Sequence, residues 1–146
     1  MSTSSAVHAF GSFLKRGDGG SPETFTTIAE ILTLPFPKLS HETIEVTNHS
    51  STGGWREFKP GLKDGGEFSI DVNYLPTDAT HNATTGMLYD LAANNGTRNY
   101  QIVMSNALSN VWAFSAIVTG FEVDASIDSQ LKATITFKVT GQPTLT

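Results

Sequence analysis

The sequence predicts a mainly β protein, a β-sandwich or β-roll with one flanking α-helix. Two observations carry this prediction. Residues 67–74 and 130–140 alternate apolar and polar side chains over their whole length, which is the pattern of strands with one buried face. Only residues 84–96 place apolar side chains along a helical stripe. The length of 146 residues fits a single domain around one core.

Residues 25–34 and 42–47 form the first two predicted strands. The first segment is rich in β-branched and apolar residues, and the second alternates apolar residues with acids. Pro35 and Pro37 end the first strand, because proline cannot donate a hydrogen bond to a sheet. Residues 48–66, which show no clear periodicity, then separate these strands from the next.

The predicted helix, residues 84–96, follows the third strand. Thr84 or Thr85 can cap its N-terminus, and Gly96 can end it. After the helix, the sequence predicts strands at 98–105, 111–128 and 130–140. Gly120 lies inside the second of these and predicts a bend or bulge there.

The two ends of the chain show little periodicity. Residues 1–22 combine Ser, Gly, His and Lys, so we interpret them as a flexible N-terminal arm. The β-sandwich domain would then cover residues 23–141, with a C-terminal tail at 142–146.

The composition excludes several classes of function. Nine basic and fourteen acidic residues give a formal charge of −5, which argues against a protein that binds nucleic acid by neutralising phosphates. It leaves open a protein that lets nucleic acid pass without binding it. The absence of cysteine excludes disulfides, thiolate catalysis and cysteine-based zinc sites. Neither a signal peptide nor a membrane-spanning segment is expected.

Catalytic motifs are absent from the sequence. The four histidines are not spaced as metal ligands, and the chain contains no nucleophile-elbow, phosphate-loop or zinc-protease motif. Glu67 and Asp71 share one face of a predicted strand, which is weak support for a glycosidase because such acids are usually only solvated. We expect no cofactor and no metal.

Acidic residues form a row on two predicted strands. Glu122, Asp124 and Asp128 share one face of residues 111–128, and Glu67 and Asp71 repeat the arrangement on the earlier strand. One interpretation is an ordinary solvated face. The other is a wall that repels a polyanion, because carboxylates release no counterions from passing DNA.

The long segment 48–66 combines aromatic and charged residues in a way that suits a protein interface. Turn signals at Pro60-Gly61 and Asp64-Gly65 argue against disorder. The alternative is a loop folded back on its own domain. The candidate contact residues are Trp55, Arg56, Glu57, Phe58, Lys59, Lys63 and Asp64.

The stretch ETIEVTNHSSTGGWREFKPGLKDGGEFSIDVNY, Glu42 to Tyr74, resembles the signature region of the major tail tube proteins of long, flexible-tailed bacteriophages. FTTIAEI before it and GMLYDLAANNGTRNYQIV after it are similar to that family in kind and order. The resemblance covers about residues 20–140. The residues of the arm match no family motif.

The resemblance implies a structural virion protein whose subunits join their sheets into a hexameric inner β-barrel. Rings would stack into a tube around a tape-measure protein and meet tail terminator and tail-tip proteins. Double-stranded DNA would pass through the lumen, and the protein would be made in the bacterial host cytoplasm. The acidic row would then line the lumen, and the long segment would bridge subunits of the same or the adjacent ring.

Two other functions remain open on the sequence alone. One is a carbohydrate-binding β-sandwich on a virion or cell surface, with Trp55 as a sugar platform. The other is a small hydrolase that uses paired acids.

Overall fold

A computed structural model describes residues 11–93, 96–104 and 110–146 of the protein. Strands dominate, and one α-helix is present in these residues, so the predicted mainly β class is confirmed. The elements in chain order are β1 (Phe13–Gly17), β2 (Phe25–Thr27), β3 (Ile31–Thr33), β4 (Ser40–Glu45), a 3₁₀ turn (Thr52–Gly54), β5 (Phe58–Asp64), β6 (Glu67–Asn73), α1 (Met87–Ala92), β7 (Arg98–Val103), β8 (Val111–Asp124) and β9 (Lys132–Leu145).

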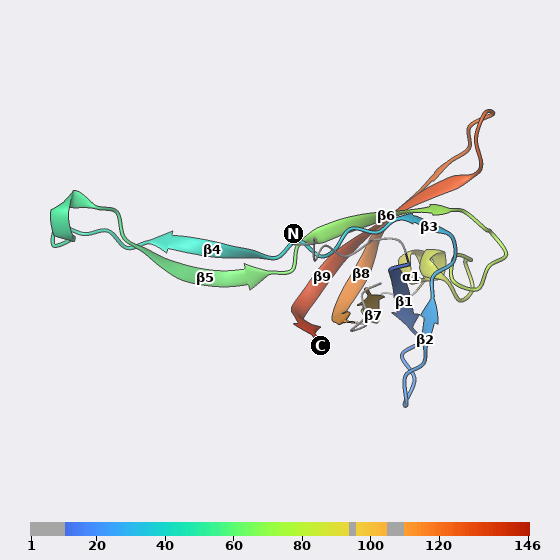
Figure 1. Cartoon of the computed structure of the whole chain (residues 1–146), viewed down its shortest axis with the longest axis horizontal. Helices are drawn as coiled ribbons and strands as arrows, with labels where there is room; N and C mark the ends of the chain where they lie inside the picture. Colours follow the sequence, from blue (N-terminus) through green and yellow to red (C-terminus); the bar gives the residue numbers. More distant parts are fainter. Residues whose placement is uncertain (1–10, 94–95, 105–109) are drawn as a thin grey trace, which may run out of the picture.

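Seven strands form one antiparallel sheet in the order β2-β1-β7-β8-β9-β6-β3, while β4 and β5 form a separate hairpin (Figure 1). The sheet is curled. The rings of Phe68 on β6 and Phe114 on β8 lie 5.5 Å apart across β9, and those of Tyr100 on β7 and Phe137 on β9 lie 5.1 Å apart across β8. Because neighbouring strands are about 4.8 Å apart, such contacts between alternate strands indicate a concave inner face.

A single segment connects the two ends of the strand order. β2 and β3 are consecutive in the chain, and only residues 28–30 separate them. The Ile28 N–H donates to the Leu14 carbonyl on the β1 side at 2.9 Å, and the Asn73 N–H on β6 donates to the Glu30 carbonyl at 2.9 Å. The segment therefore crosses from one margin of the sheet to the other and closes it into a roll.

The core lies on the concave face. β6 and β9 contribute alternate residues that are almost fully buried, as their sequence period of two predicts. Met87 of α1 is fully buried in the same cluster. The core residues are Leu14, Ile28, Phe68, Ile70, Val72, Met87, Tyr100, Ile102, Phe114, Ala116, Val118, Ala133, Ile135, Phe137 and Val139.

The helix is shorter than the sequence predicts, covering Met87–Ala92 rather than 84–96. The N-cap position is Gly86 without a side-chain cap, so the predicted threonine cap is wrong. Instead, the Asn82 side-chain oxygen accepts the N–H groups of Thr85 and Gly86 at 2.8 and 3.0 Å, which turns the chain into the helix. A Cβ on Gly86 would lie 2.5 Å from the Asn82 nitrogen, so glycine is required there.

The ends of the domain also differ from the prediction. Residues 13–17, assigned to a flexible arm, instead form β1 inside the sheet, and residues 1–10 of that arm lie outside the described residues. The predicted C-terminal tail continues β9 as far as Leu145. β8 ends at Asp124 rather than 128, and its register shifts between Val118 and Gly120, where the bulge was predicted.

Candidate assembly surfaces

The segment predicted as a long loop is half of an extended β-hairpin. β4 and β5 pair from Ser40 opposite Asp64 to Glu45 opposite Phe58. Figure 1 shows this hairpin projecting away from the body of the protein. The sequence did not predict β5, because Pro60 is a poor strand residue. In addition, neither face of the hairpin is buried, so apolar and polar residues do not alternate along it.

The tip of the hairpin, residues 46–57, has a defined conformation. The Val46 N–H donates to the Glu57 carbonyl, and the Glu57 N–H donates to the Thr47 hydroxyl, both at 2.8 Å. The Ser51 hydroxyl donates to the Glu57 carboxylate at 2.8 Å. These bonds hold a fixed turn that presents Trp55 to solvent.

Large apolar side chains are exposed along the whole hairpin. Trp55 is 78 % exposed and Leu62 79 %, while Ile44 and Phe58 are each 54 % exposed. No residue of β4 or β5 is buried. A two-stranded hairpin alone is marginally stable in water, and an apolar patch of this kind marks an interaction site.

The structure brings all seven predicted contact residues onto this hairpin. Trp55, Arg56 and Glu57 are the last three residues of the tip segment, and the others lie on β5. Asp64 differs from the rest, because its carboxylate lies 3.3 Å from Lys138 of its own chain. The Gly66 N–H and this lysine hold the pKa of Asp64 below its usual value. Asp64 therefore anchors the hairpin base.

Two glycines join the hairpin to the body. Gly66 has φ +74°, a conformation that favours glycine, and a Cβ there would collide with the Lys38 carbonyl. Gly65 is buried, and a Cβ there would collide with Val139. The chain thus passes from β5 to β6 through a joint that leaves no room for a side chain.

We expect Gly66→Ala to destabilise the folded monomer. The left-handed conformation costs a non-glycine residue about 1–2 kcal/mol, and the collision with Lys38 adds to it. Gly141→Ala is the matched control, since Gly141 has φ +79° but no atom near the added Cβ. Urea unfolding should show the larger loss for Gly66→Ala; equal losses would contradict a tightly packed joint.

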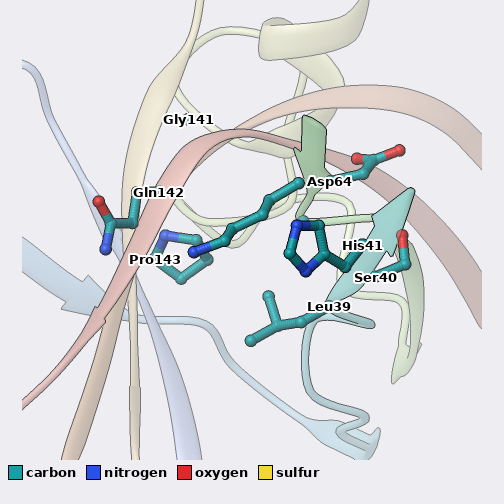
Figure 2. A pocket seen from close by; sticks show the side chains of 9 residues that line it. Leu39, Ser40, His41, Asp64, Gly141, Gln142 and Pro143 are labelled. Atoms are coloured by element: carbon teal, nitrogen blue, oxygen red, sulfur yellow. The ribbon is translucent and has the colours of Figure 1, made fainter. Parts of the chain in front are cut away.

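A groove lies between the hairpin base and the end of β9. It has a volume of about 510 Å³. Figure 2 shows Leu39 and His41 on the hairpin side and Gln142 and Pro143 on the β9 side facing this space. Lys63 also lines the groove. Its ammonium group has no acidic partner among the described residues of the chain.

The predicted acidic row is largely brought together. Asp71 and Glu122 lie opposite Thr134 from either side, so they share one face of the sheet. By the same register, Glu67 and Asp124 belong to this face, which is the convex one. Asp128 does not, because it lies beyond β8 in the turn before β9.

Two lysines interrupt the row, which the sequence analysis did not foresee. Lys138 on β9 lies opposite Glu67, and Lys132 lies opposite Asp124. Opposite charges across a strand pair contribute roughly 0.2–1 kcal/mol each. The convex face of β6, β9 and β8 is therefore a mixed surface with four carboxylates and two ammonium groups.

Arg16, Arg98 and Asp90 form a buried ionic cluster that the sequence did not predict. Two Arg16 nitrogens each donate to Asp90 at 2.7 Å, and the Arg98 Nε donates to the same carboxylate at 2.5 Å. Burial opposes the charge of Arg16, yet Asp90 outweighs it and raises the pKa of this guanidinium. Burial and the Asp90 charge likewise raise the pKa of Tyr100. The cluster ties β1, β7 and α1 together.

In the residues that the structure covers, no three His, Asp or Glu side chains gather as metal ligands. The described part of the chain also lacks a helix that is both long and apolar enough to cross a membrane.

A family model described as the lambda phage tail tube protein, TTP, matches residues 13–146. The chain belongs to this family. A search of curated protein sequences found no significant match. The family is one of structural proteins of the virion tail, so the resemblance noted in the sequence is confirmed.

Solved structures share the fold of this tail tube family member at low sequence identity. One is similar over 97 % of this chain and 99 % of its own, with 18 % identity and a TM-score of 0.74; it is the tail of an empty gene transfer agent particle, with C6 symmetry. Another, the tube-terminating cap of the anti-feeding prophage, shares 15 % identity over 100 % of this chain and 94 % of its own, with a TM-score of 0.72. A third is the SPP1 tail tube, with 12 % identity over 96 % and 78 % of the two chains and a TM-score of 0.69.

Proposed function

We propose that this tail tube protein assembles into hexameric rings that stack into a conduit for double-stranded DNA. The observation that carries the proposal is the projecting β4–β5 hairpin, whose large apolar side chains are exposed. A hairpin this exposed gains its stability from a neighbouring surface. Membership of the tail tube family makes a second copy of this chain the natural neighbour.

The ring would close through strand pairing between subunits. The strands at the margins of the sheet, β2 and β3, are three residues each and are joined through residues 28–30. β8 offers a longer edge, since β7 pairs with it only along Val111–Ala116. Its remaining residues, Ile117–Asp124, meet β9 on one side and no described strand on the other. Such an edge attracts a further strand, and a closed inner barrel would satisfy it.

The convex face of β6, β9 and β8 would line the lumen. Glu67, Asp71, Glu122 and Asp124 outnumber the lysines of this face. DNA would release few counterions on meeting it, so it would pass without binding. Asp128 falls outside this role because it lies in the β8–β9 turn.

The other proposed partners are a tape-measure protein, a tail terminator and tail-tip proteins. Structural neighbours include a tube-terminating cap and a baseplate, which supports contacts at both ends of a tube. We propose that the subunit is made in the host cytoplasm and needs no cofactor or metal.

Electron microscopy of the purified protein tests this function. We expect six-fold rings or long tubes that retain no double-stranded DNA in a filter-binding assay. Reversing Asp71 and Glu122 to lysine should make the tubes bind DNA, because basic groups would then release counterions. A strictly monomeric protein that binds glycans would contradict the proposal and favour the carbohydrate-binding alternative. Failure of the lysine variants to bind DNA would mean that the charge of this face does not govern its contact with DNA.

A further inference from the structure

The turn between β8 and β9 is a second projecting feature of the subunit. Residues 122–130 are all exposed, and Figure 1 shows this hairpin end extending beyond the body. At its end Ile127 is fully exposed to solvent. Asp124 and Asp128 flank it. The result is an apolar knob with acidic neighbours.

The groove beside the hairpin base lies toward the opposite end of the same strands. β9 leaves the knob at Lys132 and reaches the groove at Gly141–Pro143. At about 3.3 Å per residue, this stretch separates the two features by roughly 30 Å. The knob therefore cannot enter the groove of its own subunit.

The charges of the two features are complementary. Lys63, at the groove, has no acidic partner among the described residues, and Asp64 beside it is already paired with Lys138. His41 lines the same space. The knob carries the opposite sign in Asp128, whereas Asp124 already lies opposite Lys132. The groove also offers Leu39 and Pro143 as an apolar floor for Ile127.

We propose that Ile127 of one subunit inserts into the groove at Leu39 and Pro143 of a second copy in the adjacent ring, with Asp128 facing Lys63. This contact is heterologous, because the two surfaces differ and lie toward opposite ends of the subunit. Repeated contacts of this kind generate an open filament rather than a closed dimer. The inference rests on the proposed tube function and specifies how one ring stacks on the next.

Disulfide trapping tests the contact directly, since the chain has no cysteine. Tubes of the double variant Ile127→Cys with Gln142→Cys should form a ladder of linked chains on oxidation, with loss of the monomer band. The matched control is Ile127→Cys with Thr26→Cys, because Thr26 is exposed on β2 away from the groove. Control tubes should remain monomeric on the same gel.

Assembly variants provide a second readout. Ile127→Asp should yield rings without tubes; its full exposure means that the fold does not depend on it. Asp128→Lys and Lys63→Asp should each shorten tubes, and the double reversal should restore their length. Restoration would be unexpected if the two residues did not face each other.

The possible failures are distinguishable. If the unmodified protein forms neither rings nor tubes, the proposed function fails. If tubes form, Ile127→Asp tubes keep normal length and the Ile127–Gln142 pair does not cross-link, only the stacking contact is overturned. A Gln142→Cys link to Trp55→Cys, or to a cysteine within residues 2–9, would mean that another segment occupies the groove and would also overturn it.

Discussion

Trp55→Ala should abolish or strongly weaken tube assembly while leaving the folded subunit intact. The indole is 78 % exposed at the end of the hairpin, so its removal takes almost nothing from the core. Exposed substitutions of this kind usually change the free energy of unfolding by no more than about 0.5 kcal/mol. A tryptophan buried at the centre of an interface contributes at least ~2 kcal/mol, which corresponds to roughly a 30-fold rise in the concentration needed for assembly.

The measurement pairs urea unfolding of the monomer with sedimentation of tubes over a concentration series. Leu32→Ala is the matched control, because Leu32 is an exposed apolar residue on β3 outside the proposed contacts. It should assemble like the unmodified protein. Arg56→Glu should resemble Trp55→Ala, since it reverses a charge at the same tip. Equal losses of folding and assembly in Trp55→Ala would mean that the tip packs on its own subunit.

The strands that were predicted well from the sequence are those with one buried face and one solvent-exposed face. β6 and β9 alternate because every second residue enters the core. The glycine at position 120 was correctly interpreted as a bulge, since a residue without a side chain inside an apolar strand has few other uses. In these segments local pattern and tertiary structure agree.

β5 could not be predicted from an alternating pattern, because neither of its faces is buried. Its composition, with Pro60 and Gly61, is that of a loop, and no face of it is buried in the subunit. The proposed contact role does not depend on the backbone prediction, because aromatic and charged side chains on one segment favour an interface in a loop and in a hairpin alike. The segment expected to be a loop is therefore part of a β-hairpin, and the contact role of its residues stays a prediction.

The lysines of the convex face and the N-terminal strand β1 were not predicted, for a different reason. Lys132 and Lys138 enter the acidic row only through cross-strand register, which one strand's pattern does not contain. β1 is five residues long and places Arg16 toward the core, which looks like a surface position in the sequence. Its partner Asp90 is 74 residues away, so no local pattern could reveal the pair.

Asp90→Ala should produce the largest loss of monomer stability among the polar substitutions considered. Its carboxylate is the shared acceptor of two guanidinium groups, Arg16 and Arg98. Breaking a buried ion pair by removing one partner typically costs 3–5 kcal/mol, because the remaining charge stays desolvated. Domains of this size have a total stability of about 5–15 kcal/mol, so a substantial fraction could unfold. Urea unfolding at low protein concentration measures the loss, and Asp128→Ala, at an exposed position in the β8–β9 turn, should change stability by less than about 0.5 kcal/mol.

The order of effects within the cluster separates a charge effect from simple packing. Removing Asp90 leaves two buried cations with no counter-ion, whereas removing either arginine leaves one neutral pair. Asp90→Ala should therefore cost more than Arg16→Met, although arginine is the larger side chain. Arg16→Met should in turn cost more than Arg98→Met, because the Arg98 side chain is the more exposed, at 15 % against 9 %. If the losses followed side-chain size instead, the cluster would act by filling space, and the shared carboxylate would not be what ties β1 and β7 to the helix.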